Sequence, residues 1–149
     1  YELGRILVCA SSLGLARAAM DDALGHAASH MVKGRRLSSL PQIQEKLADM
    51  EVRLRSMESL VYHAAKLAGD GGDEARLACA LMKRFVPKAA TDVASEALQI
   101  FGGAGYTDET RVGRIWQDCR GNQIAQGTDE IMVGLIAKLL VSEAVRDGA

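Results

Sequence analysis

The chain has 149 residues, a formal net charge of -1 and 4% aromatic residues, with proline at only two positions. This length supports one domain with a real hydrophobic core and is too short for two large ones. Charges of both signs are mixed along the chain without a basic stripe, which argues against a nucleic-acid partner. Few aromatics and many aliphatic residues favour helices packed on helices over a sheet.

Neither a membrane span nor a secretory signal is expected from the sequence. The apolar run at residues 131–141 contains Lys138 and is too short to cross a bilayer. The three cysteines are odd in number and lack the spacing of a metal site. They predict a reducing compartment, either a bacterial cytoplasm or the mitochondrial matrix. Because the chain opens with Tyr1 inside an apolar-periodic pattern, we expect it to be a piece of a longer protein.

Two long helices are predicted in the first half. The first extends from about Leu3 to Val32. The second is capped by Ser38 or Ser39, and Pro41 suits its first turn. Apolar residues recur along both at helical spacing. In the first helix the predicted buried residues are Leu13, Ala16, Met20, Leu24 and Ala27, and in the second they are Leu47, Met50, Leu54, Met57 and Val61.

The second half predicts a third long helix and two later helices. The third helix begins at Asp73 and reaches Phe101, where two consecutive glycines stop it. A short helix follows from about Val112 to Cys119, and the last helix extends from about Thr128 to Val145. Long helices joined by short loops predict an all-α fold, an antiparallel four-helix bundle.

Helical bundles often hold di-iron centres through Glu-x-x-His pairs, but this chain does not fit that pattern. The residues three positions before its histidines are Ala23, Ala27 and Leu60, so no metal is predicted. The glycine cluster at positions 102, 103 and 105 is most simply a helix terminator. Such a cluster can also let backbone amides approach phosphates, although alone this is a weak signal.

Three motifs carry a resemblance to a known family: "LPQIQEKLADM", "EALQIFGGAGYTDE" and "RIWQDCRGNQIAQGTDEI". In order and spacing they resemble the C-terminal domain of the acyl-CoA dehydrogenase family over essentially the whole chain. The resemblance implies bound FAD, an acyl-CoA or acyl carrier protein thioester as substrate, an unspecified electron-transfer partner, and a homo-oligomer or mixed tetramer. Complete members also carry an N-terminal helical domain and a middle β domain, neither of which is present in residues 1–149.

The resemblance implies cofactor contacts at five positions that keep the family pattern. Gln99 matches a glutamine that holds part of FAD, often across a subunit interface. Gly102 and Gly103 match a backbone approach to the same cofactor. Thr128 and Glu130 match positions that contact FAD beside the catalytic loop.

Further positions are implied near the substrate, and two cofactor positions depart from the pattern. Arg5 matches an arginine near the CoA channel, Tyr1 an aromatic residue there, and Gly127 follows the catalytic position. Where the family has Arg-x-x-Phe-Gly, with contacts to a neighbour's FAD, this chain has His30 and Lys33 before a retained glycine. A lysine meets a phosphate as a point charge and cannot replace a guanidinium fork or a ring.

The largest departure concerns the catalytic base. Family members usually carry a glutamate before Gly-Thr, and here that residue is Gln126. Others carry the glutamate on the first helix immediately before the arginine matched by Arg5, and here that residue is Gly4. An amide cannot accept the α-proton as a carboxylate does. Three hypotheses remain: a dehydrogenase with an unusual base, a partner subunit that binds FAD or acyl-CoA without ordinary dehydrogenation, and a bundle kept for assembly alone.

Overall fold

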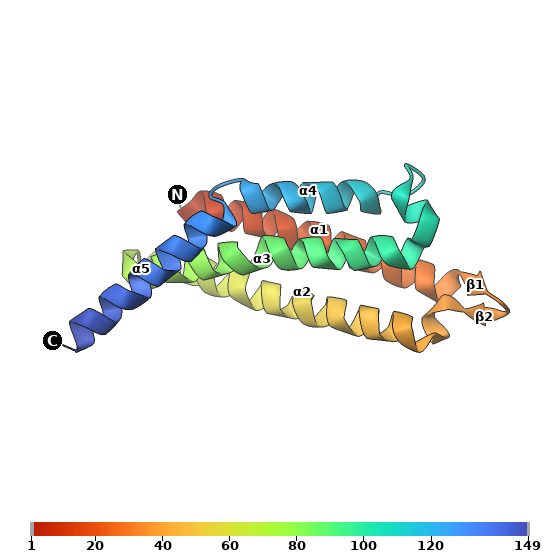
Figure 1. The fold of residues 1–149 in the computed structure, drawn as a ribbon, viewed down its shortest axis with the longest axis horizontal. Helices are drawn as coiled ribbons and strands as arrows, with labels where there is room; N and C mark the ends of the chain where they lie inside the picture. Colours follow the sequence, from red (N-terminus) through yellow and green to blue (C-terminus); the bar gives the residue numbers. More distant parts are fainter. Residues whose placement is uncertain (1, 149) are drawn as a thin grey trace.

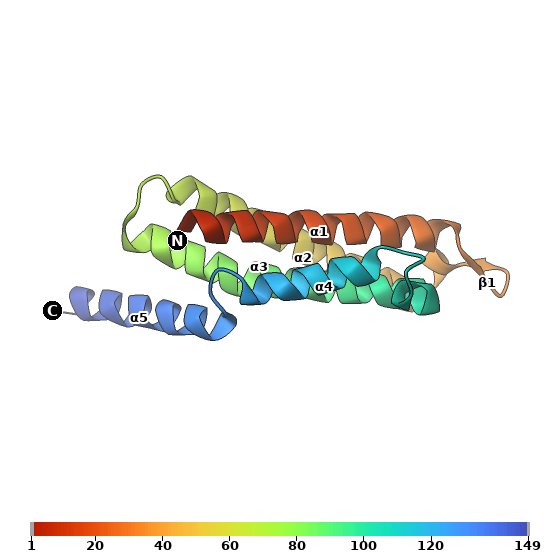
Figure 2. The ribbon, with the colours of Figure 1, turned by 90° about the horizontal axis from the view of Figure 1, so that it is seen from above.

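A computed structural model describes residues 2–148 and confirms the all-α class, with four helices in an antiparallel bundle (Figure 1). The bundle consists of α1 (Glu2–Ser29), α2 (Pro41–Leu67), α3 (Gly72–Phe101) and α4 (Val112–Ile124). A further helix, α5 (Asp129–Asp147), extends beyond one end of the bundle, as Figure 2 shows from above. A two-stranded hairpin of β1 (Met31–Val32) and β2 (Arg35–Arg36) lies at the other end.

The central element is α3, which contacts each of the other four α-helices. Seven of its buried residues are alanines, whose short side chains let α1, α2 and α4 approach closely. Two short 3₁₀ helices, η1 (Leu37–Ser39) and η2 (Gly102–Tyr106), complete the connections. The glycine pair therefore ends α3 as predicted, with Gly102 at the C-cap. A helix that contacts every neighbour fixes the positions of both ends of the bundle.

The predicted apolar stripe of α2 is confirmed at four of its five positions. Met50, Leu54, Met57 and Val61 are buried, while Leu47 is partly buried and packs against the same core. On α1 the predicted stripe is correct at Ala16, Met20 and Ala27 and only partly buried at Leu13. Leu24, however, is 47% exposed. The actual stripe of α1 is shifted toward small residues, namely Cys9, Ser12, Ala16, Ala19, Ala23 and Ala27.

The prediction that the first helix reaches Val32 is wrong, because α1 ends at Ser29 and a β-hairpin follows. Lys33 and Gly34 form its two-residue loop with φ of 49° and 79°. Two consecutive positive φ angles are what the favoured two-residue hairpin turn requires, and glycine supplies the second without steric cost. Val32 pairs with Arg35 across the hairpin.

Two helix boundaries also differ from the prediction. The N-cap of α2 is Leu40, because the hydroxyl of Ser39 donates to the carbonyl of Arg36 within η1 and is not used as a cap. The predicted short helix continues beyond Cys119 to Ile124. Thr128 occupies the N-cap of α5 as expected, but its side chain makes no capping hydrogen bond to the helix backbone.

Within residues 2–148, α1 passes a test of length and apolar composition for a membrane-spanning helix. The same helix contacts α2, α3 and α4 and contributes buried residues to the bundle. Core helices of bundles pass that test as well, so the feature is weak evidence for a membrane segment. The expectation of no membrane span stays a prediction.

Truncating the core position Leu54 tests the register of α2. Leu54 is 2% exposed, so Leu54→Ala should lower the free energy of unfolding by about 2–5 kcal/mol through lost burial and a residual cavity. The matched control is Val52→Ala on the same helix, where the side chain is 65% exposed and the change should stay within about 0.5 kcal/mol. Chemical denaturation measures both, and equal effects would show that the register is wrong.

Candidate functional site

The residues singled out from the sequence gather at two separate places on the bundle. Gly4, Arg5, Gln126, Gly127, Thr128 and Glu130 lie where α4 gives way to α5, beside the N-terminal turn of α1; we call them the loop group. His30, Lys33, Gln99, Gly102 and Gly103 lie at the hairpin end; we call them the hairpin group. Tyr1 lies outside the described residues.

The separation between the two groups follows from α3. Arg84 on α3 forms an ion pair with Asp129 at the start of α5, at 3.4 Å, and so marks the level of the loop group. Gly102 is 18 residues farther along the same helix. At the α-helical rise per residue the two groups are roughly 27 Å apart. In Figure 1 the hairpin lies at one end of α3, and the α4–α5 connection lies well along α3 toward the other end.

The loop group is built on an unusual backbone conformation. Gln126 has a φ of 58°, which non-glycine residues rarely adopt, and Gly127 follows with a φ of 108°. Such strain persists where the surroundings hold the chain in place. The side chain of Gln126 is exposed, so the loop presents its amide at the surface of the described chain.

Gly4 and Gln126, the two positions that the sequence resemblance matches to a catalytic base, meet in space. A Cβ atom built on Gly4 would lie 2.7 Å from Oε1 of Gln126 and 3.1 Å from its Cδ. The Gln126 side chain therefore lies over the bare backbone of Gly4. The first turn of α1 and the α4–α5 loop thus form one location, and that location holds an amide and a glycine.

Arg5 joins the same location from the next position on α1. A Cβ atom on Gly127 would lie 4.0 Å from Nη2 of Arg5, so the arginine and the loop are neighbours. Nε of Arg5 is buried and has no hydrogen-bond partner among the described residues. A buried guanidinium nitrogen without an acceptor carries a desolvation cost that a bound oxygen atom would remove.

The carboxylates of the two segments that form the loop group are not tuned to act as a replacement base. Asp129 is paired with Arg84. The pKa of Glu130 is lowered by hydrogen bonds from the backbone amide of Glu130 itself and from the Thr128 side chain. The pKa of Glu2 is likewise lowered, mainly by a hydrogen bond from the backbone amide of Glu2 itself. A general base works best when its pKa lies near the working pH, so these downward shifts act in the wrong direction.

Lys83 of α3 lies against the loop and was not singled out from the sequence. Its side chain is fully buried, and Nζ donates to the carbonyl oxygens of Gly127, at 3.0 Å, and Gln123, at 3.4 Å. Burial lowers the pKa of Lys83. The only sequence signal was a lysine at a position where helical spacing predicts burial, and the scatter of basic residues was interpreted as a solvated face.

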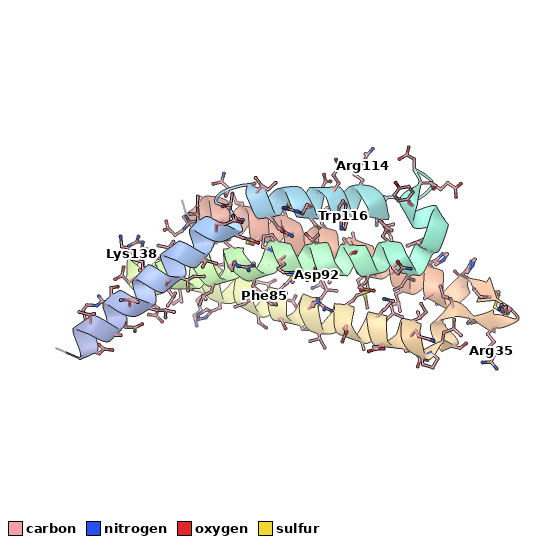
Figure 3. All side chains as sticks on the ribbon, in the orientation of Figure 1. Arg35, Phe85, Asp92, Arg114, Trp116 and Lys138 are labelled. Carbon is pink, nitrogen blue, oxygen red and sulfur yellow. The ribbon has the colours of Figure 1, made fainter. Side chains whose placement is uncertain are left out.

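The hairpin group combines ring stacking with positive charge. The ring of His26 stacks on Phe101, with centroids 4.3 Å apart, and on His30, at 4.7 Å. Burial and the nearby His30 lower the pKa of His26, which favours the neutral form of this ring. Lys33 is exposed in the turn of the hairpin, and Arg35 and Arg36 follow it on β2 and are exposed as well. The sequence interpretation missed both arginines, of which Arg35 is labelled in Figure 3.

The hairpin group also offers accessible backbone. Gly102 and Gly103 are exposed, and a Cβ atom at either position would meet nothing within 4 Å. Open glycine backbone at the same end of the bundle as three basic side chains suits a diphosphate. Gln99 is exposed one turn earlier on α3. These residues therefore fit one part of a dinucleotide, while the loop group lies too far away to belong to the same contact surface. In residues 2–148 no three His, Cys, Asp or Glu side chains gather as a metal site would require.

Comparison with known families shows to which family this chain belongs. Residues 2–141 match the family model described as "Acyl-CoA dehydrogenase, C-terminal domain". The chain belongs to the acyl-CoA dehydrogenase family. The family consists of flavoprotein oxidoreductases, and the match confirms the resemblance seen in the three sequence motifs.

Relatives extend the match to whole proteins and solved structures. The chain is 36% identical to a probable acyl-CoA dehydrogenase of Escherichia coli K12, over 96% of this chain and 37% of that protein. An acyl-CoA dehydrogenase from Slackia heliotrinireducens superposes with a TM-score of 0.89 and 50% identity, covering 97% of this chain and 38% of the other. Butyryl-CoA dehydrogenase from Megasphaera elsdenii gives 0.90 and 36%, covering 94% and 36%.

The chain therefore spans little more than a third of the length of these relatives. The comparisons identify the domain and its family of flavoproteins. The activities in the relatives' names belong to proteins of which this chain matches little more than a third.

Two alanine substitutions on α1 test the contact between Gly4 and Gln126. Gly14 has nothing within 4 Å of a built Cβ atom, so Gly14→Ala should stabilise the helix by about 0.5–1 kcal/mol. Gly4→Ala should stabilise the helix less than Gly14→Ala does. It should also displace the Gln126 side chain, because the new methyl group would occupy its place. Unfolding free energies and the NMR signals of the Gln126 side-chain amide measure this. Unchanged Gln126 signals in Gly4→Ala would contradict the contact.

Proposed function

We propose that this chain is the C-terminal domain of an FAD-dependent protein of acyl-CoA dehydrogenase type that acts on acyl thioesters. The family assignment supports a flavin, and the basic, glycine-rich hairpin group supports FAD in particular, because its diphosphate needs positive charge and open backbone amides. When bound, FAD supplies the acceptor for the hydride that leaves the β-carbon of the thioester. The residues of this chain hold the cofactor and substrate and occupy the position of the base.

The two groups of site residues support a homo-oligomer or mixed tetramer. Roughly 27 Å along α3 separates the loop group from the hairpin group. We assign the loop group to the flavin and thioester of its own subunit and the hairpin group to the FAD of a neighbouring subunit. In this arrangement His30 stands where the family has an arginine. Lys33, as a point charge, and Arg35 and Arg36, as guanidinium forks, supply the positive charge instead.

Substrate contacts are assigned to the loop group. Arg5 presents a guanidinium group beside Gly127, and its buried Nε has no acceptor within residues 2–148. The carbonyl or phosphate oxygens of an acyl-CoA thioester are acceptors of the kind that this nitrogen needs. Thr128 and Glu130, at the first turn of α5, form the flank of the same loop.

The observation that carries the proposal is the meeting of Gly4 and Gln126 in one location. In a complete dehydrogenase a carboxylate at this location takes the α-proton as the hydride leaves the β-carbon. Gln126 has nearly the size of glutamate and sits in the loop that would present it. The amide can hold a thioester by hydrogen bonds but cannot take the proton. We therefore propose a site with intact geometry and weak or atypical dehydrogenation.

A second candidate function rests on the same observation. Both base positions lack a carboxylate, which favours a partner subunit that binds FAD or acyl-CoA in a mixed oligomer without ordinary turnover. Assembly alone is the weakest alternative, because it gives no reason for exposed glycine backbone and basic residues at the hairpin end. The relatives named above come from bacteria, which favours the bacterial cytoplasm over the mitochondrial matrix.

Restoring the carboxylate tests the proposal. Gln126→Glu in the full-length protein should raise the rate of flavin reduction by acyl-CoA thioesters about 10²–10⁴-fold, the usual contribution of general-base catalysis. The loop need not move, since the two side chains have almost the same shape. The measurement is flavin bleaching without oxygen, across thioesters of several chain lengths.

Gln42→Glu is the matched control, because it adds the same charge at an exposed position in the first turn of α2. Its rate should equal that of the native protein. If the native protein already reduces its flavin rapidly and Gln126→Glu is slower, another group is the base and Gln126 only positions the substrate.

A further inference from the structure

Lys83 lies within the interior of the bundle, in a position that packing alone does not explain. It is among the largest side chains with no exposed surface in residues 2–148, and Asp129 and Arg5 are charged groups close enough to act on it. Burial lowers the pKa of Lys83. The thiol of Cys9 supplies no counter-charge, because burial raises its pKa to about 12. A buried amino group of this kind needs hydrogen-bond acceptors, and a bundle core normally offers none.

The acceptors of Lys83 both come from the connection between α4 and α5. Gln123 belongs to the last turn of α4, where the final carbonyl groups have no partner within the helix. A cation at this end also interacts favourably with the helix dipole. Gly127 follows Gln126 directly in the strained part of the loop. One amino group therefore joins the end of α4 to the residue after the candidate catalytic position.

Two other hydrogen bonds hold the same turn of α4 against the bundle. Nε2 of Gln123 donates to Oγ1 of Thr91 on α3, at 2.7 Å. Nδ2 of Asn122 donates to Oγ of Ser12 on α1, at 3.0 Å. Both bonds hold the last turn of α4, which precedes the loop. On the far side of Gln126, the bond from Lys83 reaches Gly127, the very next residue, and the ion pair of Arg84 with Asp129 holds the start of α5 to the same helix.

We propose that Lys83 is a positioning residue, whose amino group clamps the Gln126–Gly127 loop to α3 and holds Gln126 over Gly4. The positive φ of Gln126 and Gly127 is maintained because this bond fixes the Gly127 carbonyl. Lysines in cores also serve as Schiff-base nucleophiles. Lys83 is fully enclosed and engaged with two carbonyl oxygens, so a substrate does not reach it. The effect on catalysis rests on the function proposed above, but the clamp does not.

Lys83→Met tests the clamp, because methionine is similar in length and carries no donor. In the full-length protein, hydrogen exchange of residues 121–130 should accelerate about tenfold, while residues 41–67 of α2 change less than about twofold. Lys88→Met is the matched control on the same helix. Lys88 is 54% exposed and pairs only with Asp92 at the surface, so its variant should leave residues 121–130 unchanged.

Flavin reduction gives the second measurement. Lys83→Met should lower the limiting rate about tenfold and leave the half-saturating thioester concentration within about twofold, because the loop is misplaced while the substrate contacts remain. If Lys83→Met does not fold, Lys83→Gln keeps one donor and should give the same pattern with a smaller effect.

The outcomes separate the two proposals. Unchanged exchange in residues 121–130, or an equal increase in residues 41–67, would overturn the clamp whatever the activity. Faster exchange confined to residues 121–130 supports the clamp even if the native protein reduces no flavin. In that case only the proposed function fails.

Discussion

The packing of α3 against the other four helices is the constraint on which the rest of the structure depends. Because α3 contacts every other helix, it sets the distance between the hairpin group and the loop group. Its alanines let α1 and α4 come close enough for Gly4 and Gln126 to touch. Its one buried lysine reaches the loop itself. The helix that forms the core therefore also positions the chemistry at both ends of the bundle.

The loop that we propose as the place of the missing base keeps a geometry that costs free energy. The loop carries a non-glycine residue at a positive φ and a buried amino group beside it, and within residues 2–148 a buried arginine nitrogen there has no acceptor. Each of these features costs free energy when nothing is bound. A bundle required only for assembly would relax them through ordinary substitutions. Their presence in one small region favours a loop that binds a ligand, with Gln126 holding that ligand.

The sequence predicted the helices well because α2 and α3 have strong apolar periodicity and clear glycine terminators. It failed after Ser29, where "HMVKGRRL" has the hairpin signal of a lysine and glycine turn but follows an alanine-rich helix without a break in composition. Leu24 was predicted in the core because it is apolar, whereas α1 packs through alanines. Family motifs singled out Gln126 and Gly102 as candidate site residues, and their roles stay predictions. No motif could reveal that Gly4 and Gln126 touch or that Lys83 bonds Gly127, because both contacts join distant segments.

The most direct measurement is the visible spectrum of the full-length protein, purified without added cofactor and again after incubation with FAD. A flavin site assembled from the loop group of one subunit and the hairpin group of its neighbour predicts a yellow oligomer with about one FAD per chain, since each subunit contributes to one site of its own and one of its neighbour's. The bound flavin should also shift its spectrum when an acyl-CoA thioester is added. A folded oligomer that stays colourless and takes up no FAD would contradict this function, even though the bundle and its family would remain as described.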